Sequence, residues 1–145
     1  MTASKIVAAA ASGAGGGAGL DVDEVFKTHL WTGTGSAFSI NNGIDLSGEG
    51  GLVWIKNRGP NAANHALYDT ARGVRKFLHS NATNAQDTAS AGSGLTAFNS
   101  NGFSIGTGWV DENNSGQDVV SWTFRNSPMF QCLTYTGNGS TFFFF

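Results

Sequence analysis

Apolar side chains recur at every second position in several short stretches of the chain, which is the pattern of β-strands. The segment DVVSWTFR at 118–125 alternates most clearly, with Val120, Trp122 and Phe124 on one face. Trp54 lies in a second strong pattern, GLVWIKN. Large aromatic side chains in strong strand patterns are typical of a hydrophobic core. We therefore predict that these four residues are buried.

Glycine, asparagine and proline separate the alternating stretches, as they do at turns. Besides the segment at 118–125, the expected strands are Ala37–Ile40, Gly51–Asn57 (the GLVWIKN pattern), His65–Thr70, Arg75–His79, Leu95–Phe98, Phe103–Gly106 and Gln131–Thr136. The sequence NSNG at 99–102 lies between two of them and predicts a hairpin turn. Many short strands at close spacing predict an all-β sandwich or jelly roll.

One segment before the strands has helical periodicity instead. In DVDEVFKTHL, at 21–30, apolar residues fall on one helical face. Asp21 can cap this helix, and Glu24 follows three residues later, as in a capping box. The pattern predicts one short amphipathic helix over 21–30.

The first 20 residues differ from everything that follows. They are mostly alanine, glycine and serine, and Lys5 carries their only charge. Such a segment buries too little surface to offset its own ordering entropy. We expect residues 1–20 to form a flexible attachment arm that a partner orders. Ile6 and Val7 are its candidate assembly contacts.

A short motif occurs twice. WTGTGSAF at 31–38 recurs as YTGNGSTF at 135–142, which is 104 residues later. The repeat is either two similar glycine-rich turns or the start of a second module. We therefore divide the chain into the arm, a module over 21–134, and a segment over 135–145 that begins a truncated second module or makes a contact.

The chain ends in four phenylalanines, which would form an exposed apolar patch on a monomer. A single strand cannot bury four consecutive side chains on one face, because they alternate. We expect a contact with another chain through Phe142, Phe143, Phe144 and Phe145.

Charge and cysteine content narrow the possible functions. Only 12% of residues are charged, and the net charge is -2. The chain has no basic run, which argues against nucleic-acid binding. The single cysteine, Cys132, excludes a disulfide within one chain. No stretch approaches the roughly 20 apolar residues of a membrane span, so we expect no membrane insertion.

The segment at 109–116 (WVDENNSG) is the main candidate for ligand binding. Trp109 could stack on a sugar ring, with Asp111 and Asn113 as polar neighbours, so these three residues form a candidate glycan site. The same loop matches the first half of a calcium loop, but Trp122 stands where its closing acid is required. We expect no bound metal.

Catalytic patterns are incomplete. The glycines at 13 and 15 match a loose dinucleotide fingerprint, but no βαβ pattern surrounds them. His65 and Asp69 lie four residues apart without an evident nucleophile, so structural hydrogen bonding explains them better. No carboxylate pair suits glycoside hydrolysis. We predict that the chain is not an enzyme and binds no cofactor.

Four segments in combination resemble a known family. They are the residues at 43–58 (GIDLSGEGGLVWIKNR), 65–73 (HALYDTARG), 95–106 (LTAFNSNGFSIG) and 120–122 (VSW). They are similar to virion structural proteins, of the tail or fibre type, from tailed bacteriophages of marine bacteria. The resemblance covers roughly residues 21–141 and implies a lectin-like, concanavalin-type β-sandwich without enzymatic activity. In longer members, a similar TYTGNG segment opens a further module.

This resemblance makes a bacteriophage virion protein the leading expectation. It would be assembled in the host cytoplasm, form a homo-oligomer, and dock through its arm onto other virion proteins of the tail, adaptor or portal region. The alternative is a lectin-like module that binds a glycan of the host surface.

Overall fold

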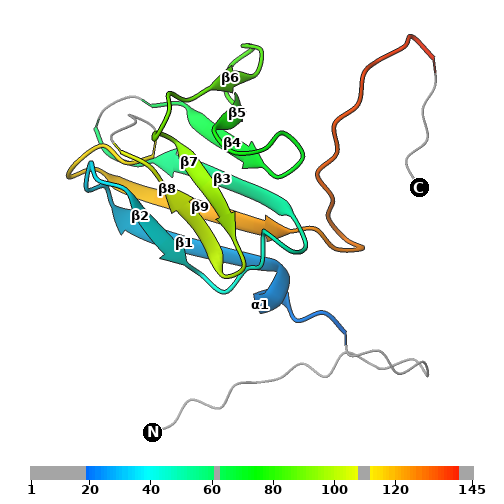
Figure 1. Cartoon of the computed structure of the whole chain (residues 1–145), viewed down its shortest axis with the longest axis horizontal. Helices are drawn as coiled ribbons and strands as arrows, with labels where there is room; N and C mark the ends of the chain where they lie inside the picture. The colour runs from blue at the N-terminus through cyan, green and yellow to red at the C-terminus, as the bar shows by residue number, and fades with distance from the viewer. Residues whose placement is uncertain (1–18, 61–62, 108–111, 141–145) are drawn as a thin grey trace, which may run out of the picture.

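The computed structural model contains two antiparallel β-sheets packed face to face, with one short helix beside them (Figure 1). It describes residues 19–60, 63–107 and 112–140. The predicted all-β sandwich with one short helix is confirmed. The expected N-terminal arm lies outside the described residues, apart from its last two positions.

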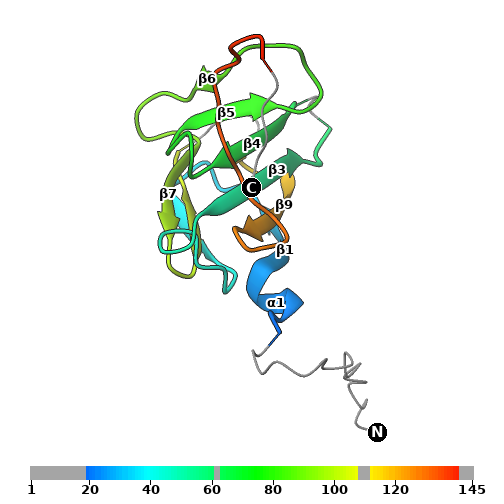
Figure 2. The same ribbon diagram turned by 90° about the vertical axis from the view of Figure 1, so that its right-hand side faces the viewer.

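The larger sheet has six strands in the order β1-β9-β3-β4-β5-β6. Its strands are β1 (Phe26–Thr32), β9 (Asp118–Arg125), β3 (Gly51–Asn57), β4 (His65–Asp69), β5 (Lys76–His79) and β6 (Asp87–Thr88). The smaller sheet, in the order β2-β8-β7, consists of β2 (Phe38–Asn41), β8 (Gly102–Ile105) and β7 (Leu95–Asn99). Figure 2 shows the two sheets as separate layers, with β7 on the left and β3 to β5 in the centre.

The hydrophobic core lies between the sheets. The large sheet contributes Val53, Ile55, Ala66, Tyr68, Phe77 and Val119, and the small sheet and its adjoining loop contribute Ile40, Ile44, Leu46, Leu95, Phe103 and Ile105. All are essentially inaccessible to solvent. Removing this apolar surface from water supplies the main stabilisation of a sandwich.

The predicted inward face of β9 is wrong. Val119 faces the core, and Ser121 and Thr123 share its face and are fully buried. Val120, Trp122 and Phe124 therefore point outward. The predicted burial of Val120 is nevertheless confirmed, since it is only 6% exposed, whereas both aromatic rings remain partly exposed. The inward side tolerates small polar groups, since the Thr123 hydroxyl accepts a hydrogen bond from the Asn42 amide nitrogen at 2.9 Å.

Trp54 also points outward, opposite Trp122 on the neighbouring strand, and is only partly buried. Val53 and Ile55, on either side of it in sequence, take the core positions. Alternation establishes that a strand has two faces, but apolar residues occur on both faces of β3 and β9. The pattern alone could not decide which face is inside.

The predicted helix over 21–30 is wrong in its second half. Helix α1 covers only Val22–Val25, and Asp21 caps it by accepting a hydrogen bond from the Asp23 backbone N–H at 3.0 Å. Phe26 has extended dihedrals, and β1 pairs with β9 over its whole length. Seven residues of sheet pairing outweigh a helical periodicity of ten residues, because tertiary contacts override local preference.

The predicted strand over 131–136 is also wrong. These residues form no strand, and the edge of β9 next to them is occupied by β1. The hairpin predicted at 99–102 is confirmed as the β7–β8 turn, with Gly102 at φ +131°. The polar segment over 81–94 contains the short strand β6.

Candidate functional site

The outward side of the large sheet carries a group of aromatic rings that we call the aromatic face: Phe26, Trp54, Trp122, Phe124 and Phe130. Trp54 and Trp122 lie directly opposite each other on β3 and β9, with ring centroids 5.5 Å apart in an edge-to-face arrangement. Phe124 packs between Phe26 and Phe130, at centroid distances of 4.9 and 5.1 Å. Such geometries stabilise aromatic pairs beyond the area that they bury.

Aliphatic side chains extend this face across the sheet. The pairing register places Leu52 opposite Phe124, and Leu67 opposite both Trp54 and Leu78. These three leucines are partly buried. At the β1 edge, Leu30 is 61% exposed. Apolar side chains thus lie on the outward side of five strands, although antiparallel sheets commonly turn polar residues toward water.

The aromatic face has a polar border at His65. The indole N–H of Trp54 donates a hydrogen bond to Nδ1 of His65 at 2.9 Å, which fixes the indole orientation. The Lys56 ammonium donates to the Ala63 carbonyl at 2.6 Å. Burial, together with the charge of Lys56, lowers the pKa of His65 below its ordinary value. The imidazole is therefore held in the neutral form that can accept the hydrogen bond from Trp54.

The candidate glycan residues are only partly described. Trp109 and Asp111 lie outside the described residues. Asn113 is fully buried, and its amide nitrogen donates to the carbonyls of Ser36 and Gly106, both at 2.7 Å. Its amide oxygen accepts from the Thr34 backbone N–H at 2.8 Å. Asn113 therefore joins three segments of the chain, and its amide is not presented to a ligand.

Sequence reasoning missed the role of Glu112. This residue is fully buried, and its carboxylate accepts a hydrogen bond from the hydroxyl of the buried Tyr68. Its backbone carbonyl accepts the indole N–H of Trp31 at 3.1 Å. Nothing in the polar run around Glu112 marks it in the sequence as a buried residue. Only the folded loop shows that it connects β1 and β4.

His65 and Asp69 share the outward face of β4, but each has its own partners. The buried Asp69 accepts a hydrogen bond from the Arg72 backbone N–H at 2.8 Å and forms an ion pair with the Arg72 guanidinium. Both residues therefore serve the local structure. Among the described residues, no group of three or more histidine, cysteine or acidic side chains could hold a metal ion.

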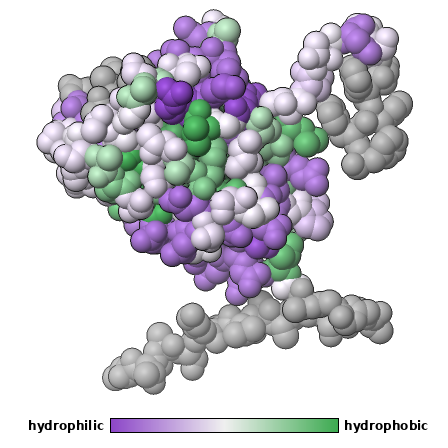
Figure 3. Space-filling view, viewed as in Figure 1, coloured by the Kyte–Doolittle hydropathy of each residue, from purple (hydrophilic) through white to green (hydrophobic). Residues whose placement is uncertain are grey.

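An open groove lies at one end of the sandwich, with a volume of about 640 Å³. Its walls are the loop over 46–50, the residues Thr70 and Val74, the strand segment over 96–98, and Asn126. They present hydroxyl, amide and carboxylate groups beside the partly buried ring of Phe98. Figure 3 shows the side of the molecule that carries the small sheet, where polar surface surrounds smaller apolar areas.

The assembly contacts predicted from the sequence cannot be placed. Ile6, Val7 and the four terminal phenylalanines lie outside the described residues. The preceding segment, over 133–140, is exposed throughout, with Leu133 56% and Tyr135 67% accessible. In the part of the chain that the structure covers, no helix has the length and apolar character needed to span a bilayer.

Residues 21–142 match the model of a family described as "Domain of unknown function (DUF7483)". No curated protein matches the chain, and no solved structure does. The family match includes the sandwich and extends over the exposed segment that follows β9. Because the match covers most of its length, this chain belongs to the DUF7483 family.

Proposed function

We propose that this protein is a structural component of a bacteriophage virion, in the tail or fibre, and that it assembles by packing its aromatic face against a second copy of the chain. The observation that carries this proposal is the outward position of Trp54, Trp122 and Phe124. A two-layer sandwich covers only one side of each sheet. The outward side of the large sheet therefore needs a partner to remove its apolar surface from water.

The composition of the aromatic face suits a protein interface. Tryptophan and phenylalanine are enriched in interface cores, whereas charged residues are depleted there. Lys56, near the end of β3, places a charged group at the border of this face. Apolar side chains at the centre and charges at the rim are the usual arrangement of a stable contact.

A second copy is the partner that we favour. Tail and fibre components are built from repeated subunits, and closed symmetric oligomers use the same patch on both subunits. A flat aromatic surface can pair with itself about a two-fold axis without charge complementarity. The sequence resemblance supplies the virion context of this proposal.

Incorporation into particles tests the proposal. A double variant, Trp54→Thr/Trp122→Thr, removes both indoles and keeps residues that favour strands. We expect it to fold but to be absent from purified particles in a mass-spectrometric census. The matched control is Ser39→Ala/Ser104→Ala on the outward side of the small sheet, where the two hydroxyls are 2.9 Å apart. Equal incorporation of both variants would contradict the proposal.

Glycan binding remains a second candidate because of the groove beside β7. Thr70, Thr96 and Asn126 can form hydrogen bonds with sugar hydroxyls, and the Phe98 ring can contact a sugar face. A glycan array probed with the whole chain would detect such binding. Signals that are lost in Phe98→Ala and retained in Trp54→Thr/Trp122→Thr would favour this function over assembly through the aromatic face.

A further inference from the structure

The segment after β9 repeats β1 and the turn that follows β1. Residues 130–140 read FQCLTYTGNGS, and residues 26–36 read FKTHLWTGTGS. The phenylalanine, the aromatic residue, both turn glycines and the serine fall at equivalent positions. The DUF7483 match covers both segments, so the repeat belongs to the family domain.

The two copies of this repeat, which we call the first copy (26–36) and the second copy (130–140), also adopt the same local turn. Gly35 has φ +73° and Gly139 has φ +77°. The Ser36 backbone N–H donates to the Thr34 hydroxyl at 3.1 Å, and the Ser140 N–H donates to the Asn138 side-chain oxygen at 2.9 Å. Residues 133–140 of the second copy are exposed, whereas the turn of the first copy is docked on the sandwich. The turn is therefore encoded locally and already has the shape that docking requires.

Where the first copy docks on the sandwich, position 33 must be a glycine. The Gly33 backbone N–H donates to the Gln117 carbonyl at 2.8 Å, and the Gly116 N–H donates back to Gly33 at the same distance. A Cβ at position 33 would lie 2.2 Å from the Asn114 carbonyl oxygen. Only glycine fits there, because the close contact is with backbone that cannot move aside.

Gly137 is the equivalent residue of the second copy. At its present position, no described neighbouring atom excludes a side chain. Its φ is not in the left-handed region, and no described atom lies within 4 Å of the position that a Cβ would take. Its surroundings therefore do not explain a glycine. Docking in the place of Gly33 does explain it.

The second copy can also make the other hydrogen bonds by which the first copy docks on the sandwich. Trp31 and the two residues after Gly33 dock through N–H groups, on Glu112 and Asn113. Every residue of the second copy at the two turn positions has a backbone N–H to donate. Tyr135 replaces Trp31 as an aromatic ring with a polar hydrogen.

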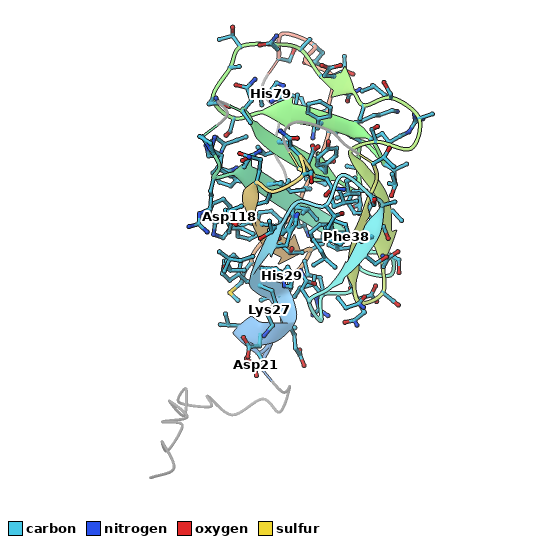
Figure 4. The ribbon with its side chains drawn as sticks, turned by 90° about the vertical axis from the view of Figure 1, so that its left-hand side faces the viewer. Asp21, Lys27, His29, Phe38, His79 and Asp118 are labelled. Atoms are coloured by element: carbon cyan, nitrogen blue, oxygen red, sulfur yellow. The ribbon has the colours of Figure 1, made fainter. Side chains whose placement is uncertain are left out.

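The second copy can reach this place within its own chain. Phe130 already stacks on Phe124, which is the residue that pairs with Phe26 at the start of β1. A hairpin turning back after Arg125 would extend this contact along β9 in the register that β1 uses now. Because β1 is the edge strand of the sheet, β9 is the only strand whose pairing must be exchanged. Figure 4 labels Lys27 and His29 on β1 and Asp118 at the start of β9, which pairs with the last residue of β1.

The apolar and polar residues of the second copy also suit the inward and outward positions of β1. On β1, His29 and Trp31 face inward and the 61% exposed Leu30 faces outward. In the same register, Leu133 would face inward, and Thr134 would replace Leu30. The exchange would cover an exposed leucine and place a threonine on the outer side.

We propose that the segment over 130–140 is an alternative edge strand that exchanges with β1 for the same place on β9. The sheet can then be completed from either end of the chain, and the strand that is left out is available for pairing with a neighbouring chain. This inference rests on the repeat and the requirement for glycine, and it does not depend on the proposed function.

The exchange can be measured by letting β1 and the second copy compete to form a disulfide with one cysteine on β9. In a chain with Cys132→Ser, the changes Leu30→Cys, Val120→Cys and Thr134→Cys place a thiol on β9 that either strand can reach, since residue 30 lies directly opposite residue 120. After mild oxidation, proteolysis and mass spectrometry report the 30–120 and 134–120 linkages. We expect both linkages in this background.

Two glycine substitutions then shift the ratio in opposite directions. Gly33→Ala disfavours β1 and should raise the share of the 134–120 linkage at least about fivefold, as expected for a change of 1 kcal/mol or more. Gly137→Ala should remove that linkage, whereas the neighbouring control Asn138→Ala should leave it unchanged. A 30–120 linkage alone in every variant, or a Gly33→Ala chain that does not fold, would overturn the proposal.

Discussion

The two sides of the six-stranded sheet differ in a way that alternation alone does not reveal. The inward side places Val53, Ile55 and Tyr68 under the second sheet, where they are fully buried. The outward side carries Trp54 and Trp122, which have larger side chains but remain partly exposed. In this sheet, side-chain size therefore does not indicate the core. The side with the larger rings is the one that we assign to assembly.

Truncation on the inward side should have the largest effect. Phe77 is 1% exposed and packs on the Tyr68 ring at a centroid distance of 5.2 Å. Phe77→Ala should lower the free energy of unfolding by about 3–5 kcal/mol, through lost burial and the cavity left behind. Urea denaturation followed by circular dichroism measures this loss. A loss below about 1 kcal/mol would mean that the inward side is not the core.

A polar change on the inward side should have an intermediate effect. Tyr68→Phe removes the hydroxyl that donates to the buried Glu112 carboxylate. Leaving a buried acceptor without its donor costs about 1–3 kcal/mol. The ring itself is retained, so packing is unchanged. Unfolding measurements on Tyr68→Phe and on the parent chain test this prediction, and equal stabilities would contradict this role for Glu112.

A large truncation on the outward side should cost less than its size suggests. We expect Trp122→Ala to lower the free energy of unfolding by about 1–2 kcal/mol at protein concentrations that keep the chain monomeric. The partly exposed indole loses its edge contact with Trp54 but leaves no closed cavity. A loss as large as that of Phe77→Ala would show that the outward side is covered within the monomer.

The smallest expected effect is the pH response at His65. Its folded-state pKa is lowered by burial and by Lys56, relative to 6.5 in the unfolded chain. The neutral imidazole is therefore favoured in the fold. Its contribution is complete above about pH 6.5 and is lost as pH falls through the folded-state pKa. A histidine titration by NMR should place the pKa of His65 below 6.5, with the Trp54 indole N–H signal moving in parallel. Lys56→Met should raise the pKa of His65. A pKa of His65 at or above 6.5 in the parent chain would refute the claim that burial and Lys56 favour its neutral form.

Strand positions were the most predictable part of the fold, because alternation and turn residues are local signals. The stretches around Trp54 and Trp122 and the 99–102 hairpin follow from sequence alone. The inward direction does not, since both faces of β3 and β9 carry apolar residues. The end of helix α1 was missed because pairing with β9 draws Phe26 into the sheet.

The candidate site was less predictable than the fold. The burial of Glu112 and Asn113 depends on contacts with Tyr68 and with the turn after β1, both distant in sequence. No local pattern reports such contacts. The repeat after β9 was visible in the sequence, and a strand was separately expected over 131–136. These residues form no strand, and the edge of β9 that they would pair with in the proposed exchange is occupied by β1.

Sedimentation velocity tests the central claim most directly. We predict that the chain self-associates at micromolar concentration and that Trp54→Thr/Trp122→Thr sediments as a monomer with cooperative unfolding intact. The control Ser39→Ala/Ser104→Ala should associate like the parent chain. A parent chain that remains monomeric at all accessible concentrations, or a double variant that associates equally well, would contradict the assignment of the aromatic face as the contact between copies.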